Sequence, residues 1–171
     1  MLGLNRYIVD DSEPNPEWAS EYEVIATQIR RATNGIELEL EHIGSTSVPN
    51  LVAKPVIDVG ILLPDELQFN ELVAALSSIN LIYRGDKGAV GGRMFVRESA
   101  TEFRTHHIHV YFKGAPEWDR YLIFRDNLRA NATLREEYSA LKRKLAVQYR
   151  DDRIAYTDAK SEFVNRILNV R

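Results

Sequence analysis

Between Ile36 and Leu63 the sequence holds a pattern that restricts the fold more than any other part of the chain. Ile36, Leu38, Leu40 and His42 alternate with three glutamates, which predicts a half-buried strand. Gly44-Ser45-Thr46 then supplies a residue free to take positive φ, followed by two hydroxyls. The run from Val56 to Leu63 predicts a second strand, apolar except for one acid, Asp58. The segment is therefore typical of two strands joined through a sharp turn.

Asp58 is the most informative single residue of this segment. A carboxylate in a buried strand is costly unless it is paired or holds a cation. We therefore expect the Gly-Ser turn and Asp58 to converge on a phosphate and its metal. Two structural alternatives stay open: Asp58 accepts hydrogen bonds from loop amides or pairs with an arginine, and the turn is only a tight turn with a capping hydroxyl.

Five stretches of sequence carry a resemblance to a known family. His42-Ile-Gly-Ser-Thr46, followed by Ala53-Lys-Pro-Val-Ile-Asp58, resembles the GrpB-like family, bacterial proteins placed by fold in the nucleotidyltransferase superfamily. Further matches are the stretches 105–110, 114–118 and 124–126, so the resemblance covers nearly the whole chain. It implies an α+β fold, in which a small mixed β-sheet is flanked by helices and followed by a C-terminal helical cap.

The resemblance also implies a site. In the superfamily pattern the backbone of a turn such as Gly44-Ser45-Thr46 and the serine hydroxyl approach the phosphates of a nucleotide. Asp58 would hold a divalent metal, Mg²⁺ or Mn²⁺ with Zn²⁺ as an alternative. Active members usually place a second acid two residues later, but this chain has Gly60 there. Glu39 and Glu41 are the nearest candidates to replace it.

His107 and His109 lie two residues apart on a predicted strand, so both side chains point to one face and His106 to the other. With Asp58 they could bind a transition metal, or one of them, His109 first, could act as a general base. The competing interpretation is a pair of hydrogen-bonded core histidines. His42, beside the turn, is a further candidate for the same group.

Lys54 and Arg93 are the main cationic candidates for nucleotide binding. Lys54 lies in the connector between the turn and Asp58, and Arg93 follows a glycine-rich loop. A guanidinium group suits phosphate oxygens well. Arg84 and Lys87 are weaker candidates, and we interpret Arg125-Asp126 first as part of an ion pair between a helix and the sheet.

Periodicity and turn residues predict the remaining elements. We expect one unit, with the sheet and its helices in residues 1–115 and the helical cap in 116–171. The predicted strands cover residues 7–10, 36–42, 56–63, 81–83, 93–97 and 104–112. The predicted helices begin at 16, 64, 117, 133 (a capping box, Thr133 with Glu136) and 157, and residues 84–92 form a loop with four glycines.

Composition excludes several classes of function. The 171 residues include no cysteine, so disulfides and thiolate metal sites are excluded. A net charge of −3 argues against a general nucleic-acid binder. No apolar run approaches the length of a membrane span, and the N-terminus lacks the pattern of a secretory signal. We therefore expect a cytoplasmic protein without a membrane partner.

The leading hypothesis is a nucleotidyltransferase-like domain that binds a nucleotide and a divalent metal and transfers a nucleotidyl or phosphoryl group. Asp58, His109 and Ser45 are its expected catalytic residues. One alternative is a catalytically inactive relative that binds a ligand or a protein partner, as the resemblance to domains fused to dephospho-CoA kinase implies. The other is a metal-dependent hydrolase that acts on a small phosphorylated metabolite through Asp58, His107 and His109.

Overall fold

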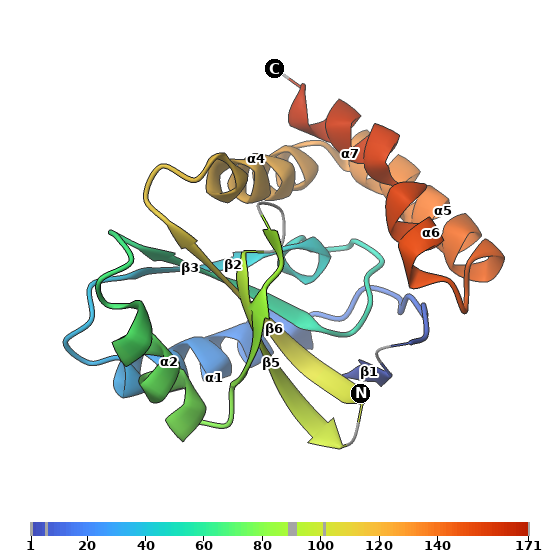
Figure 1. The fold of residues 1–171 in the computed structure, drawn as a ribbon. Helices are drawn as coiled ribbons and strands as arrows, with labels where there is room; N and C mark the ends of the chain where they lie inside the picture. The colour runs from blue at the N-terminus through green and yellow to red at the C-terminus, as the bar shows by residue number, and fades with distance from the viewer. Residues whose placement is uncertain (1, 6, 89–91, 101, 171) are drawn as a thin grey trace.

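A computed structural model describes residues 2–5, 7–88, 92–100 and 102–170 (Figure 1). Within these residues one six-stranded sheet has the order β2-β3-β6-β5-β4, and β1 pairs with the start of β6. The strands are β1 (Leu4–Asn5), β2 (Glu39–Ile43), β3 (Ile57–Leu63), β4 (Ile82–Asp86), β5 (Arg93–Ala100) and β6 (Phe103–Phe112). β3 and β6 are parallel and the other pairs antiparallel, which confirms the expected mixed sheet.

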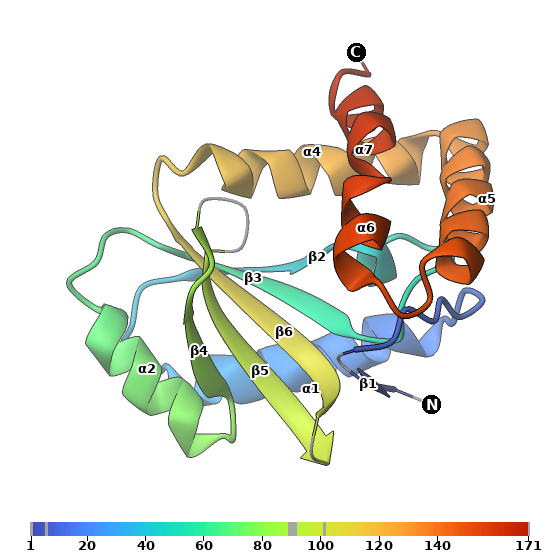
Figure 2. The ribbon, with the colours of Figure 1, turned by 45° about the vertical axis from the view of Figure 1, so that its right-hand side comes forward.

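Helices cover the two faces of the sheet differently (Figure 2). α1 (Glu17–Ala32) and α2 (Phe69–Ser78) lie against one face, and α4 (Pro116–Ala130) crosses the other. Alternation along β3 decides which residues meet which helices, because Ile57, Val59, Ile61 and Leu63 all point to the first face. The α+β class predicted from the sequence is therefore confirmed.

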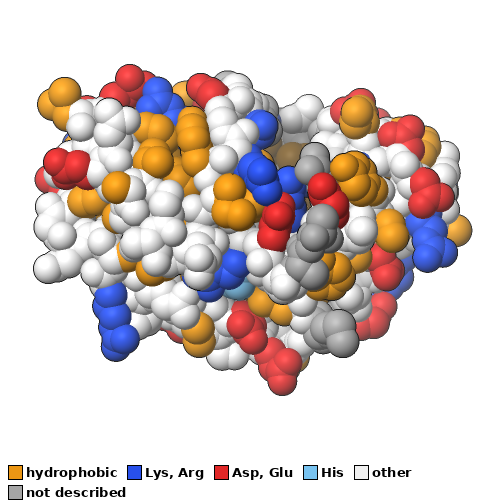
Figure 3. Space-filling model, turned by 60° about the horizontal axis from the view of Figure 1, so that its bottom comes forward, with side chains coloured by type: hydrophobic (Ala, Val, Ile, Leu, Met, Phe, Trp, Pro, Cys, Tyr) orange, Lys and Arg blue, Asp and Glu red, His pale blue; other side chains and the backbone are white. Residues whose placement is uncertain are grey.

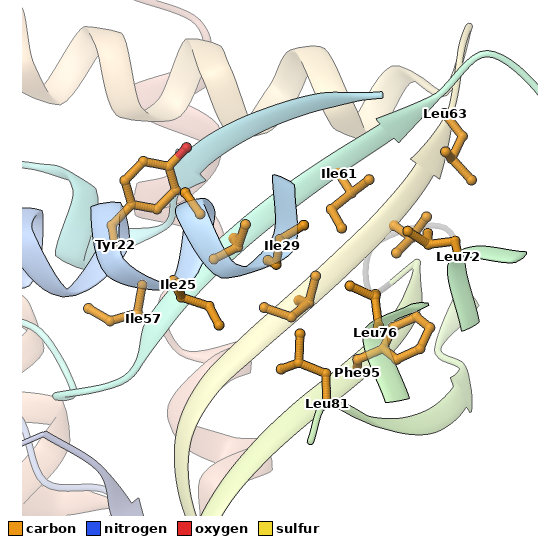
Figure 4. Close-up of a cluster of buried hydrophobic side chains, with 14 of the residues drawn as sticks. Tyr22, Ile25, Ile29, Ile57, Ile61, Leu63, Leu72, Leu76, Leu81 and Phe95 are labelled. Carbon is orange, nitrogen blue, oxygen red and sulfur yellow. The ribbon is translucent and has the colours of Figure 1, made fainter. Parts of the chain in front are cut away.

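The main hydrophobic core lies between the sheet and the pair α1 and α2 (Figure 4). Ile25 and Ile29 of α1 pack on β3, while Leu72 and Leu76 of α2 pack toward Phe95 of β5. All five side chains are completely or almost completely buried. This face is closed by apolar contacts and leaves the chemistry to the other face.

The chain after the sheet is helical to its end. The helices that follow α4 are α5 (Ala132–Gln148), α6 (Arg153–Asp158) and α7 (Ser161–Leu168). A second buried cluster joins them to the connector after the turn, where Val48 and Leu51 pack against Phe124, Leu128 and Ile167. α4 and α7 therefore stand beside the Gly-Ser turn, a position that matters for the site.

Several predicted boundaries are wrong in instructive ways. The first strand is β1 and not residues 7–10, because the start of β6 extends beyond β3 and pairs there. α2 begins at Phe69 and not at residue 64, since Asp65 caps a turn by accepting a hydrogen bond from Leu67. β4 takes in Arg84 to Asp86 of the predicted glycine loop, and residues 89–91 of that loop lie outside the described residues.

The C-terminal helices also differ from the prediction. The side chain of Asn131, rather than that of Thr133, accepts a hydrogen bond from the first turn of α5. The expected single helix from residue 157 is two short helices, α6 and α7, that meet at Ala159 and Lys160.

Two further observations concern the hydrophobicity of the helices and the distribution of charge on the surface. In the described chain, no helix combines the length and apolar character needed to cross a bilayer. On the face drawn in Figure 3, the described acidic and basic side chains are interspersed with exposed hydrophobic ones instead of forming one broad basic patch.

Candidate functional site

Parallel pairing of β3 with β6 brings three potential metal ligands together. Asp58 is opposite His107, and Gly60 is opposite His109, so the carboxylate and both imidazoles share one face. Oδ1 of Asp58 lies 3.2 Å from Nδ1 of His107 and 3.6 Å from Nε2 of His109. One ligand atom from each residue lies within 4.8 Å of the other two. The same-face prediction for the two histidines is confirmed.

The Gly-Ser turn closes directly onto the Asp58 carboxylate. Gly44 ends β2 with a φ of +68°, and the short 3₁₀ turn Ser45–Ser47 follows. A Cβ atom at residue 44 would lie 2.6 Å from Oδ2 of Asp58. Glycine is therefore needed both for the backbone conformation and for the close approach of the carboxylate. The expected convergence of turn and acid is present in the fold.

An aromatic ring occupies the space in which a side chain at residue 60 would lie. A Cβ atom at residue 60 would lie 2.8 Å from Cζ3 of Trp118 in α4 and 3.3 Å from Cγ2 of Ile43. A second strand carboxylate cannot enter this position while the indole stays in place. The ligand group thus has one carboxylate and two imidazoles.

The two glutamates on β2 do not replace the missing acid. Glu41 lies opposite Gly60, so it is on the correct face, but its carboxylate pairs with Arg125 of α4 at 2.6 Å. Arg125 also donates to the carbonyl of His42 and to Asp126, which confirms the predicted ion pair between helix and sheet. Glu39 is exposed near the start of β2. These contacts fix α4 against the edge of the sheet.

The electrostatic environment favours an ionised Asp58 beside neutral imidazole. Burial acts to raise the pKa of Asp58, but His107 and His109 outweigh it and hold that pKa well below its usual range. Burial lowers the pKa of His107 although Asp58 opposes the effect. A carboxylate with neutral imidazoles is the protonation state that binds a metal. The donor set fits a transition-metal ion better than Mg²⁺, which prefers oxygen ligands.

An open cleft of about 310 Å³ reaches the ligand group at Asp58, which is one of its lining residues. Its polar part includes Ser45, Asp58, Arg120 and Lys160, and Tyr121 lies beside them. Its apolar part comes from the last helices, with lining residues Phe124, Val164 and Leu168. Burial raises the pKa of Tyr121 to about 12, so its phenol stays protonated at neutral pH. The cleft can therefore accept a ligand with a charged end and an apolar end.

Two residues of the predicted group point away from this cleft. The register places Ile43 opposite Asp58, so His42 lies on the other face, where it stacks on Tyr22 at 4.6 Å. Nε2 of His42 lies 3.1 Å from the hydroxyl of Thr46, which also donates to a backbone carbonyl. Burial lowers the pKa of His42 to about 4. The expectation that His42 joins the site is wrong, and the Thr46 hydroxyl serves the turn.

The predicted cationic residues also lie elsewhere. The ammonium group of Lys54 lies over the ring of Tyr156. Lys54 also lines a separate small cavity, and His107 is another of its lining residues. Arg93 pairs with Glu66 and stacks on two phenylalanine rings, so the structure does not bring it to the cleft. Arg84 pairs with Glu98 on the neighbouring strand.

Sequence reasoning missed Trp118 of α4, which packs on Gly60, and three residues that line the cleft: Arg120 and Tyr121 of α4, and Lys160 at the junction of α6 and α7. Only Gly60 carries a signal for one of them, because a glycine inside a buried strand often marks a close approach of another group. Nothing in the local pattern around Lys160 indicates that it faces Asp58.

The turn, the strand carboxylate and the mixed sheet define a nucleotidyltransferase-like fold. Crystal structures of the Cid1 poly(U) polymerase share it, at a TM-score of 0.51 and 12% identity over 72% of this chain and 41% of Cid1. A family model described as GrpB protein matches residues 9–170. The chain belongs to the GrpB family.

Solved and curated relatives agree with this assignment. The crystal structure of conserved protein GrpB from Enterococcus faecalis matches with a TM-score of 0.83 and 33% identity, over 93% of this chain and 94% of that one. The UPF0157 protein PA4798 of Pseudomonas aeruginosa is 39% identical over 90% of this chain, and UPF0157 protein YqkA of Bacillus subtilis is 33% identical over 88%. This chain spans 64% and 43% of these two relatives.

A dephospho-CoA kinase of Mycolicibacterium paratuberculosis is also similar, at 27% identity over 86% of this chain. The similarity covers 42% of that kinase. The domain therefore has a counterpart within a longer protein.

Proposed function

We propose that this protein binds a divalent metal through Asp58, His107 and His109 and a nucleotide in the adjoining cleft, and that it acts on the nucleotide's phosphates. The observation that carries the proposal is the convergence of three ligand atoms, within 4.8 Å of one another, beside Gly44 and Ser45. A metal bound there would polarise a phosphate oxygen and stabilise charge that develops on it.

The residues of the chain have distinct roles in this proposal. Asp58 supplies the negative charge of the ligand group, and His107 the neighbouring imidazole. Gly44 lets the backbone approach, and Ser45 offers a hydroxyl at the phosphate end of the cleft. His109 completes the ligand group or, where it is not a ligand, takes the proton from an attacking hydroxyl.

The apolar part of the cleft supports a nucleotide over a simple phosphate. Phe124, Val164 and Leu168 can cover a planar base while the charged end meets the phosphates. Cid1, which shares the fold, was crystallised with MgATP. Nucleotides are therefore the first ligands to test.

Two other candidates are each supported by one observation. The donor set of one carboxylate and two imidazoles suits a hydrolase that uses a single transition-metal ion on a phosphorylated metabolite. The indole at Gly60 supports a catalytically inactive relative that binds a ligand or a protein partner, because it occupies the place of a second carboxylate.

Metal analysis of the purified protein tests the proposal first. We expect about one equivalent of Zn²⁺, Mn²⁺ or Fe²⁺ per chain, lost in His107→Gln. His106→Gln is the matched control, because His106 is on the same strand but points to the opposite face. Asp58→Ala should also lose the metal while its melting temperature stays close to that of the wild type. A large fall in melting temperature would instead identify Asp58 as part of a structural ion pair.

Nucleotide binding is the second test. Titration with ATP, GTP and CTP in the presence of Mg²⁺ or Mn²⁺ should give saturable binding to at least one of them, weakened in Asp58→Ala. No binding to any nucleotide, together with no metal uptake, would overturn the proposal. A single stoichiometric protein partner that still binds Asp58→Asn would favour the inactive relative.

A further inference from the structure

Two lysines from distant parts of the chain share one buried tyrosine ring. Nζ of Lys54, just before β3, lies 4.5 Å from the centre of the Tyr156 ring, and Nζ of Lys160, between α6 and α7, lies 4.1 Å from it. Tyr156 is completely buried, and its hydroxyl donates to Asp11 at 2.7 Å. The Tyr156 ring of α6 therefore makes cation–π contacts with two ammonium groups.

A third lysine increases the positive charge of this cluster. Lys142 of α5 is buried, donates to the carbonyl of Val52 and lies 3.8 Å from the carboxylate of Asp11. Among the residues that the structure describes, neither Lys54 nor Lys160 has a carboxylate within ion-pair distance. The cluster therefore holds three lysines and one carboxylate, that of Asp11, and Lys142 is buried while Lys54 and Lys160 are partly buried.

The excess of lysines in this cluster has an energetic cost. Cations held away from water without a counter-ion are unfavourable, and aromatic faces compensate only in part. Burial, together with Lys142 and Lys54, lowers the pKa of Lys160 to about 7. An anion placed against Lys160 would remove this penalty.

Only some of these lysines can be reached by a ligand in the cleft. Lys160 lines the cleft together with Ser45, Asp58 and Arg120. Lys54 lines a separate small cavity, as His107 does, and Lys142 is buried and lines neither of these two cavities. A ligand would therefore contact Lys160 directly, while the other two lysines would contribute positive potential.

We propose that Lys160, assisted by Arg120, binds an anionic phosphate group beside the one held at the Gly44-Ser45 turn, so that the cleft selects ligands with at least two linked phosphates. The inference rests on the proposed function in assigning the ligand to this cleft. It adds a specificity-determining residue, because a monophosphate could occupy only one of the two positions.

Pyrophosphate binding tests this role without a nucleotide or a metal. Full-length protein is stripped with EDTA and dialysed, and pyrophosphate and inorganic phosphate are titrated by calorimetry. We expect tighter binding of pyrophosphate than of phosphate, and roughly tenfold weaker pyrophosphate binding in Lys160→Met. Methionine keeps the long side chain against Tyr156, and Lys160→Arg should restore most of the affinity.

Lys144→Met is the matched control, because Lys144 is an exposed lysine of α5 and its loss changes the net charge equally. Equal pyrophosphate affinity of Lys160→Met, Lys144→Met and the wild type would overturn the inference, as would equal affinity for phosphate and pyrophosphate. Circular dichroism and melting temperature confirm that each variant is folded.

The outcomes separate this inference from the proposed function. Pyrophosphate binding that depends on Lys160 in a protein that takes up no metal would preserve the lysine's role and remove the metal centre. Metal uptake that His107→Gln abolishes, with pyrophosphate binding indifferent to Lys160→Met, would do the reverse.

Discussion

The two faces of the sheet are built from the same strands and serve opposite purposes. On β3, Ile57, Val59 and Ile61 point to α1 and α2, and their side chains are almost completely buried. The residues between them, Asp58 and Gly60, point to α4 and carry a charge or no side chain at all. One face is closed by apolar packing, whereas the other leaves an open cleft.

Because side chains alternate along a strand, the seven residues of β3 supply core residues to one face and a candidate ligand residue to the other. The apolar face rests on α1 and α2, which precede and follow the strand pair in the chain. The polar face depends on α4 and α7, which come from the end of the chain. Substitutions on the two faces should therefore change different measurements.

The largest effect on stability is expected on the apolar face. Ile61→Ala should lower the free energy of unfolding by about 2–5 kcal/mol, because it removes a completely buried side chain from a closed core. Leu62→Ala, the neighbouring residue on the partly covered face, should cost about 1 kcal/mol. Urea denaturation of both variants measures the difference. Equal losses of unfolding free energy in the two variants would show that the two faces contribute equally to stability.

A smaller loss of stability is expected from a substitution at Gly60, where the indole of Trp118 packs on the polar face. Gly60→Asp should lower stability by about 1–3 kcal/mol, because its Cβ would collide with Trp118 and its carboxylate would lack a partner. The cost of the same change should be smaller in a Trp118→Ala background, which a double-mutant cycle measures. If the two changes were additive, the indole would not be what keeps a second acid out.

The smallest expected effect is a change in the number of protons bound at the polar face. Because the pKa of Lys160 is lowered to about 7, its side chain is mostly neutral at about pH 8.5 in the empty cleft. Lys54 and Lys142 favour this neutral form, and Asp11 and Asp58 oppose it. Bound pyrophosphate favours the ammonium form, so binding should take up a fraction of a proton.

Calorimetry in two buffers with different ionisation enthalpies measures this proton uptake. Lys160→Met should show less uptake than the wild type, and the difference removes the contribution of pyrophosphate itself. Identical uptake by both proteins would mean that another group takes up the proton.

Local patterns in the sequence predicted the part of the site that comes from the sheet. Alternation along a strand predicts that His107 and His109 share one face, and Gly44 signals the turn, whereas the parallel pairing of β3 with β6 brings Asp58 beside them. Alternation also misled in one case. His42 follows the apolar positions of its own strand, and that side of β2 faces α1 rather than the cleft.

The part of the site that depends on long-range packing could not be predicted. The contact between Trp118 and Gly60 joins a helix to a strand far away in the chain, and only the tertiary structure sets it. The break between α6 and α7, where Lys160 reaches the cleft that Asp58 also lines, has no strong local signal, and the periodicity continues across it. Arg93 shows the reverse error, because a plausible position after a glycine loop is used for packing on Phe69 and Phe112.

The cleft lies between the sheet with its Gly-Ser turn on one side and α7 on the other. Ser45 and Asp58 belong to the turn and the sheet, whereas Val164 and Leu168 belong to α7. A small molecule that contacts both sides of the cleft would connect α7 to the turn and the sheet. A ligand bound as we propose would contact both sides of the cleft and so increase the order of α7, and a segment that follows α7 would respond to the ligand through that helix.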